Sequence, residues 1–142
     1  MTLIATESVA EILGLGASVR TPHDLETAVS EGLPKRSLEL LSTRLFQEAK
    51  VASAYKFKVV PHATWKRRTR RLSVAESEKT ERLARVLAAA EFVFRDRKEG
   101  REWMSRPHPE LHGRAPLDVA RTELGARRVE DILGAILFGL PV

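Results

Sequence analysis

The side chains best suited to chemistry in this sequence are a cluster of positive charges near its middle. Residues 49–75 contain eight basic side chains and no acidic one. The whole chain has a net charge of +5, so the remainder is net negative. Clustered charge of one sign attracts a polyanion such as nucleic acid. A solvated basic surface is the alternative, but such a surface ordinarily contains acids as well. The segment therefore predicts nucleic-acid binding.

Two short helices are expected to carry this charge. Residues 46–54 favour helix. Lys56–Val60 alternates locally like a strand, but we interpret it as the end of one helix and the turn into the next. Pro61 then begins a short basic helix that reaches Arg71, and the pair predicts a helix-turn-helix. Trp65 is expected to anchor this helix in the core. The side chains expected to contact phosphates or base edges are Thr64, Lys66, Arg67, Arg68, Arg70 and Arg71.

Metal binding and catalysis are not expected. His108 and His112 have the spacing of metal ligands, but Pro109 separates them outside any expected helix, so the two rings need not converge. Glu110 and Asp118 are too scattered for a general acid/base pair. The sequence has no nucleophile elbow, phosphate loop or triad. We therefore expect no catalytic residue, no metal and no cofactor, and hence no enzyme.

The elements that position these residues are expected to be helices throughout, which makes the fold class all-α. Thr21-Pro22 begins a helix that ends at Gly32. The capping box Ser73–Glu76 begins a long helix that reaches about Arg97. Residues 1–20 show only a weak helical pattern and are expected to be a flexible arm. A third helix is indicated by apolar residues at helical spacing, Leu38, Leu41 and Leu45.

The length and composition set the remaining limits. A chain of 142 residues suits one domain, or two very small ones that share a core. The N-terminus lacks the pattern of a signal peptide, and no stretch approaches the roughly 20 apolar residues of a membrane span. The sequence contains no cysteine, which fits a reducing compartment. We expect a cytoplasmic protein without membrane contact.

The C-terminal third combines a stiff loop with an amphipathic helix. Pro107, Pro109, Gly113 and Pro116 punctuate the loop. Residues 123–138 follow as a helix with Ala126, Val129, Leu133 and Ile136 on one face and further apolar residues beside them, Ile132, Leu137 and Phe138. Packing inside the molecule accounts for part of this apolar surface. The surplus predicts a protein partner.

The pattern of residues in this loop and helix resembles, at fixed spacing, that of the C-terminal toxin-binding domain of Xre/MbcA/ParS-type antitoxins. These antitoxins are partners of RES-domain toxins. The loop matches at Pro107, Pro109, Leu111, Gly113, Arg114, Pro116, Leu117 and Asp118. The helix matches at Thr122, Gly125, Ala126, Arg127, Val129, Glu130, Asp131, Leu133, Ile136 and Gly139. The N-terminal half of the same family is matched at Thr64, Arg67, Arg68, Leu72, Ser73, Glu76, Ser77, Arg82, Leu83, Ala84, Arg85 and Val86. The resemblance spans about residues 33–139, with Trp65 in place of the family's Leu and no Gly in the turn.

The resemblance implies a domain order: a flexible arm over residues 1–20, an Xre-like helix-turn-helix domain with a connecting helix over 21–98, and a small helical toxin-binding domain over 99–142. It also implies an antitoxin that occludes the active site of a RES-domain, NAD-degrading toxin and represses its own operon by binding operator DNA. A homodimer is expected, and a higher-order complex with the toxin. The residues expected to bind the toxin are Pro107, Leu111, Arg114, Pro116, Leu117, Arg127, Ile136, Phe138, Gly139, Leu140 and Val142.

Other interpretations stay open at this stage. The chain is alternatively a stand-alone helix-turn-helix transcriptional regulator whose C-terminal helix forms a dimer. An RNA-binding module is less favoured, because the aromatic-rich sheet signatures are missing from the sequence. Within the C-terminal region, Arg114 is alternatively the internal partner of Asp118, and Phe138 is alternatively a core residue.

Overall fold

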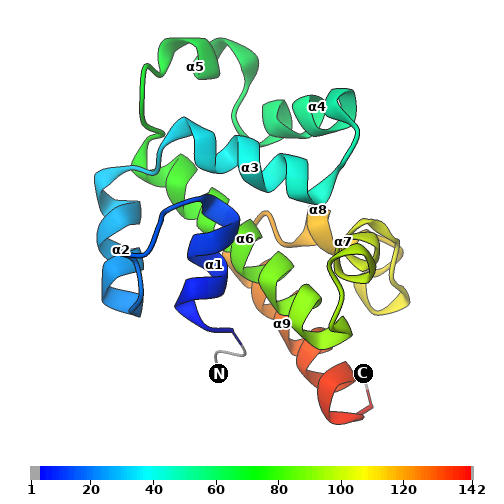
Figure 1. Ribbon diagram of the computed structural model, residues 1–142. Coiled ribbons are helices and arrows are strands. Elements are labelled where there is room, and N and C mark those ends of the chain that lie inside the picture. The colour runs from blue at the N-terminus through cyan, green and yellow to red at the C-terminus, as the bar shows by residue number, and fades with distance from the viewer. Residues whose placement is uncertain (1–3, 142) are drawn as a thin grey trace.

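Every regular element in residues 4–141, the part that the computed structural model describes, is helical (Figure 1). The first five helices are α1 (Thr6–Leu13), α2 (Pro22–Glu31), α3 (Lys35–Leu45), α4 (Ala49–Val59) and α5 (His62–Arg67). They are followed by α6 (Val74–Phe94), α7 (Arg97–Ser105), the 3-10 turn η1 (Pro109–Leu111), α8 (Pro116–Val119) and α9 (Glu123–Phe138). The all-α prediction is confirmed. None of the helices in residues 4–141 is both long and apolar enough to cross a membrane.

The long helix α6 is the centre of the fold. Ser73 and Glu76 form the expected capping box: Glu76 N–H donates to Ser73 Oγ at 3.1 Å, and Ser73 N–H donates to a Glu76 carboxylate oxygen at 2.8 Å. From that start α6 contacts α1, α2, α3 and α4 as well as α7 and α9. One continuous core therefore spans residues from Ile4 to Leu133.

Helix α1 corrects the expectation of a flexible arm over residues 1–20. Val9, Ile12 and Leu13 are buried, and α1 packs against α3 and α6. The hydroxyl of Ser37 on α3 donates to the Leu13 carbonyl at 2.7 Å. A short helix with three apolar residues on one face is held by tertiary packing, which a weak local pattern does not reveal.

The end of α6 also differs from the expected position near Arg97. Arg95 adopts a left-handed backbone conformation with φ 54° and ends the helix after Phe94. Asp96 then caps α7 by accepting a hydrogen bond from Glu99 N–H at 2.8 Å. This break turns the chain back, so that α7 packs along α6.

The start of α9 approaches α8 closely because residue 125 is a glycine. Thr122 caps α9 by accepting from Gly125 N–H at 3.0 Å. A Cβ at position 125 would overlap the carbonyl oxygen of Val119. Leu117 and Val119 on α8 are buried with the apolar face of α9. The close approach therefore fixes how the loop before α8 sits against the last helix.

We predict that Gly125→Ala lowers the free energy of unfolding by about 1–3 kcal/mol, because the added methyl group has no space. An open helical site would give the opposite sign, since Ala favours helix over Gly by roughly 0.5–1 kcal/mol. Chemical denaturation measures the difference. The control is Gly113→Ala, where φ is +79° but nothing lies within 4 Å of the added Cβ, so that only backbone strain is tested. A Gly125→Ala variant as stable as the parent would show that the α8–α9 contact is loose.

Candidate nucleic-acid and protein interfaces

The basic segment contains two short helices, α4 and α5, joined by a two-residue turn. Val60 and Pro61 alone separate the two helices, and the buried side chains of Val59 and Val60 hold the turn to the core. Figure 1 shows α5 at one end of the molecule and the C-terminal end of α9 at the opposite end. The basic side chains around α5 and the end of α9 are therefore separate surfaces.

The second helix of this pair is shorter than expected, because α5 ends at Arg67 rather than Arg71. The chain after it pairs with the connection between α2 and α3. Leu72 N–H donates to Leu33 O at 2.8 Å, and Lys35 N–H donates to Arg70 O at 3.1 Å. These tertiary hydrogen bonds replace helical ones, so Arg70 and Arg71 lie beyond the helix, in a bend and a β-bridge.

The expected nucleic-acid contacts divide into two groups in the structure. Lys66, Arg67 and Arg70 are exposed, and none of them forms an ion pair within residues 4–141. Thr64 is half-buried and accepts a hydrogen bond from the Arg67 guanidinium at 3.3 Å. These side chains are available to a polyanion.

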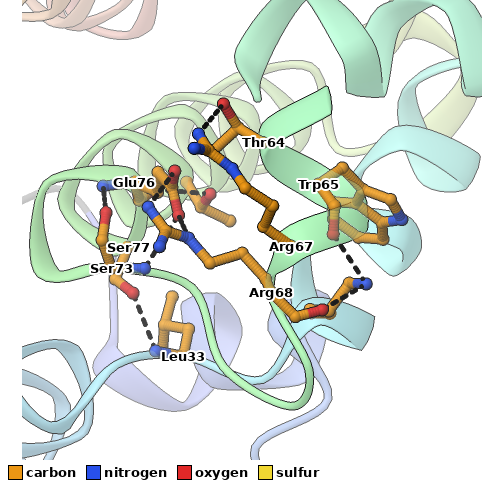
Figure 2. Close-up of polar contacts among 10 residues, drawn as sticks. Leu33, Thr64, Trp65, Arg67, Arg68, Ser73, Glu76 and Ser77 are labelled. Carbon is orange, nitrogen blue, oxygen red and sulfur yellow. Dashed lines mark hydrogen bonds and ion pairs between the residues drawn. The ribbon is translucent and has the colours of Figure 1, made fainter. Parts of the chain in front are cut away.

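Arg68 and Arg71 have internal partners instead. Arg68 makes two hydrogen bonds of 3.0 Å to the carboxylate of Glu76, which Figure 2 shows beside the helix cap. Arg71 donates to the carbonyl of Gly32 at 2.7 Å. Both guanidinium groups fix the segment between α5 and α6, and nothing in the sequence pattern distinguished them from their neighbours.

Glu76 serves the helix cap and the ion pair together. Burial alone would raise the pKa of its carboxyl group, but the hydrogen bonds from Arg68 and Ser73 outweigh burial and hold the pKa below its ordinary value of 4.5. Hydrogen bonding to Glu76 correspondingly raises the pKa of Arg68. The ionised carboxylate is therefore the form that stabilises the start of α6.

Backbone hydrogen bonds join the two ends of the loop between α7 and α8. His108 N–H donates to Arg114 O at 3.1 Å, and Gly113 N–H donates to His108 O at 3.1 Å. His108 Nδ1 accepts from Glu110 N–H at 3.1 Å, so this nitrogen serves the turn. Residues 4–141 contain no cluster of three or more His, Cys, Asp or Glu suited to a metal ion.

The loop residues that were expected to bind a toxin differ in burial: some are buried and others are exposed. Leu111, Pro116 and Leu117 are buried and fix the loop to the core. Pro107 and Arg114 are exposed. Arg114 forms no ion pair with Asp118, which is also exposed, so the internal pairing considered from the sequence is wrong.

The last turn of α9 presents apolar side chains to solvent. Phe138 and Leu140 are each 59 % exposed, so the placement of Phe138 in the core is wrong. Gly139 ends the helix with φ +65°. Beside these residues lies a cavity of about 470 Å³ that is also lined by Arg127. Ile136 is half-buried, and Val142 lies outside the described residues.

Lys35 is a residue of this region that sequence reasoning missed. Its ammonium group contacts the end of α5 from the first turn of α3. A signal was present, because α3 begins with two bases, Lys35 and Arg36, and no acid. Basic residues are unfavourable at the start of a helix, which suggests that one of them serves a different element.

The ion pair between Arg68 and Glu76 predicts how the stability of the protein depends on pH. A lowered pKa in the folded state gives stability that is present above the unfolded-state pKa, near 4.5, and is lost as the pH falls through the folded value. We expect Glu76→Gln and Arg68→Ala to lower the melting temperature at pH 7, and the deficit of Glu76→Gln to shrink below about pH 4.5. Arg67→Ala is the matched control and should melt as the parent does. A pH-independent deficit for Glu76→Gln would contradict this role.

Comparison with known proteins agrees with the geometry of the C-terminal segment. Residues 89–139 match the family model for the antitoxin Xre/MbcA/ParS C-terminal toxin-binding domain. The chain is also similar to the antitoxin Xre of Pseudomonas putida, with 27% identity over 119 residues that cover 82% of this chain and 72% of the relative. The match includes the exposed loop and α9, and antitoxins of this kind are not enzymes. Residues 89–139 are therefore similar to the toxin-binding domain of Xre/MbcA/ParS antitoxins, and most of the chain is similar to an Xre antitoxin.

Proposed function

We propose that the chain neutralises a RES-domain, NAD-degrading toxin by covering the active site of that enzyme. The observation that carries this proposal is the exposed apolar end of α9, where Phe138 and Leu140 are each 59 % exposed. Phe138 lies within the toxin-binding family match, and Leu140 directly follows it. Large side chains exposed together are a feature of protein interfaces. The RES class of the toxin is the one that the family resemblance implies.

The adjoining loop supplies the polar part of the proposed surface. Its backbone is held by hydrogen bonds between His108 and both Gly113 and Arg114, and prolines at 107, 109 and 116 stiffen it further. A preorganised loop loses little conformational entropy on binding. The exposed Arg114 offers a planar guanidinium that suits a carboxylate or carbonyl oxygens of the toxin.

We further propose that the α4–α5 pair binds operator DNA and represses the operon of the two proteins. Support comes from the three exposed bases Lys66, Arg67 and Arg70, which lie on or next to a helix-turn-helix. One six-residue helix reads few base pairs alone, and a homodimer on a two-fold related site would supply the rest. A toxin-binding domain over residues 89–139 favours this autoregulating antitoxin over a stand-alone regulator.

For the toxin surface, we predict that Phe138→Ser weakens toxin binding by tenfold or more, the range of an interface hot spot at about 1.4 kcal/mol or above. The matched control is Leu124→Ser, because Leu124 is 70 % exposed at the start of the same helix, about 21 Å away at 1.5 Å per residue. Binding to a purified, catalytically inactive toxin gives the affinities, and growth on co-expression reports neutralisation. Arg114→Ala is expected to weaken binding as well. Equal effects of Phe138→Ser and Leu124→Ser would place the contact elsewhere.

For the DNA surface, we predict that the triple change Lys66→Ala, Arg67→Ala, Arg70→Ala weakens operator binding. The slope of log K against log salt should also fall by up to about 0.9 for each phosphate that the variant no longer neutralises. Titrations of operator DNA at several salt concentrations measure both quantities. Lys98→Ala on α7, an exposed base outside the pair, serves as the control. The triple variant should still neutralise the toxin, and an unchanged salt slope would contradict the proposed interface.

A further inference from the structure

Helix α5 cannot maintain its own position. It contains six residues, none of which is fully buried, and its contact with the core is made by the half-buried Trp65. Isolated helices shorter than about 12–15 residues are marginal in water. Its basic side chains are therefore presented to a partner only if other elements hold the helix in place.

The ammonium group of Lys35 makes the contacts that do this from α3. It donates to the carbonyl oxygens of Trp65 and Arg68, each at 3.0 Å. These carbonyls lie at the C-terminal end of α5, where a positive charge is favoured by the helix dipole. The same nitrogen lies 4.4 Å from the centre of the Trp65 ring, within the range of a cation–π interaction. Figure 2 shows Trp65 on the face of α5 turned from Glu76.

The backbone at Lys35 strengthens this arrangement. Lys35 N–H donates to Arg70 O at 3.1 Å, so one residue holds both the last turn of α5 and the chain that leaves it. The approach depends on Gly32, which has φ +92° and whose added Cβ would lie 2.6 Å from Leu72 O. A second cation, Lys56, lies 4.6 Å from the Trp65 ring but donates to neither carbonyl.

We propose that Lys35 is a positioning residue for the nucleic-acid surface. It orients α5, and with it Lys66 and Arg67, without contacting nucleic acid itself. Two of its three ammonium hydrogens are directed to carbonyl oxygens, and the indole ring lies against the same nitrogen. This inference rests on the proposed DNA-binding function, although the docking of α5 by Lys35 does not.

The test compares Lys35→Met, Lys35→Arg and Lys56→Met in the full chain. Lys35→Met should weaken operator binding by tenfold or more, because α5 must then be ordered on binding. The slope of log K against log salt should stay unchanged, because Lys66 and Arg67 reach the same phosphates in the complex. Lys35→Arg should restore binding, because a guanidinium also donates to two carbonyls and stacks on an indole ring. Lys56→Met removes the second cation beside Trp65 and should have the smaller effect. A fall in slope of about 0.9 for Lys35→Met would show that Lys35 binds a phosphate and overturn the proposal.

Measurements on the free protein separate failure of this inference from failure of the DNA-binding function. In a Trp103→Phe background, Trp65 is the remaining tryptophan, and its emission should shift in Lys35→Met and return in Lys35→Arg. Amide hydrogens of α5 should exchange faster in Lys35→Met than in the parent, and Lys35→Arg should exchange as the parent does. An unchanged spectrum and unchanged exchange would overturn the role of Lys35, whether or not the parent binds DNA. Loss of toxin neutralisation by Lys35→Met would also contradict it, because the effect is expected to be local.

Discussion

The structure depends on the packing of α6, a single 21-residue helix that is surrounded by other helices. Toward its C-terminal end, the three consecutive alanines at 88–90 are all buried, so α6 is covered on more than one face at this point. The α4–α5 pair and the C-terminal helices thus share one core, and neither has a core of its own.

Ion pairs join α6 to α9. Arg85 contacts Glu81 on its own helix and Glu130 on α9 at 3.2 and 3.1 Å. Burial raises the pKa of Glu81, although the charge of Arg85 opposes this shift. The ion pair between Glu81 and Arg85 is therefore partly buried between the helices. Arg82 binds Glu123 at 3.1 Å. The two proposed functions are therefore separable as surfaces, whereas the protein folds as one unit.

Local signals in the sequence predicted the helices that begin with strong caps. The Ser73–Glu76 capping box placed the start of α6, and the spacing of apolar residues placed α9. Local sequence signals failed where tertiary contacts determine whether a helix forms or where it ends. Helix α1 is held by α3 and α6 rather than by its own pattern. The end of α5 is set by a backbone bridge between Pro34 and Arg71, two residues far apart in the chain.

At the candidate sites too, the sequence identified the region, but tertiary contacts determined the role of each residue. Residue type identified the basic cluster, but it did not distinguish Arg67, which is exposed, from Arg68, which binds Glu76. In the C-terminal loop, the family pattern selected buried anchors such as Leu111 together with exposed Arg114. A pattern of fixed spacing contains residues that build a surface as well as residues that bind through it. Only the burial of each side chain separates the two.

Hydrogen exchange of the antitoxin with and without an inactive toxin tests the central claim most directly. Exchange detected by mass spectrometry reports protection of backbone segments on binding. The account predicts protection over residues 107–117 and the end of α9, with residues 61–71 unchanged, because α5 lies at the opposite end of the molecule (Figure 1). Protection confined to residues 61–71, with no change at the end of α9, would contradict it.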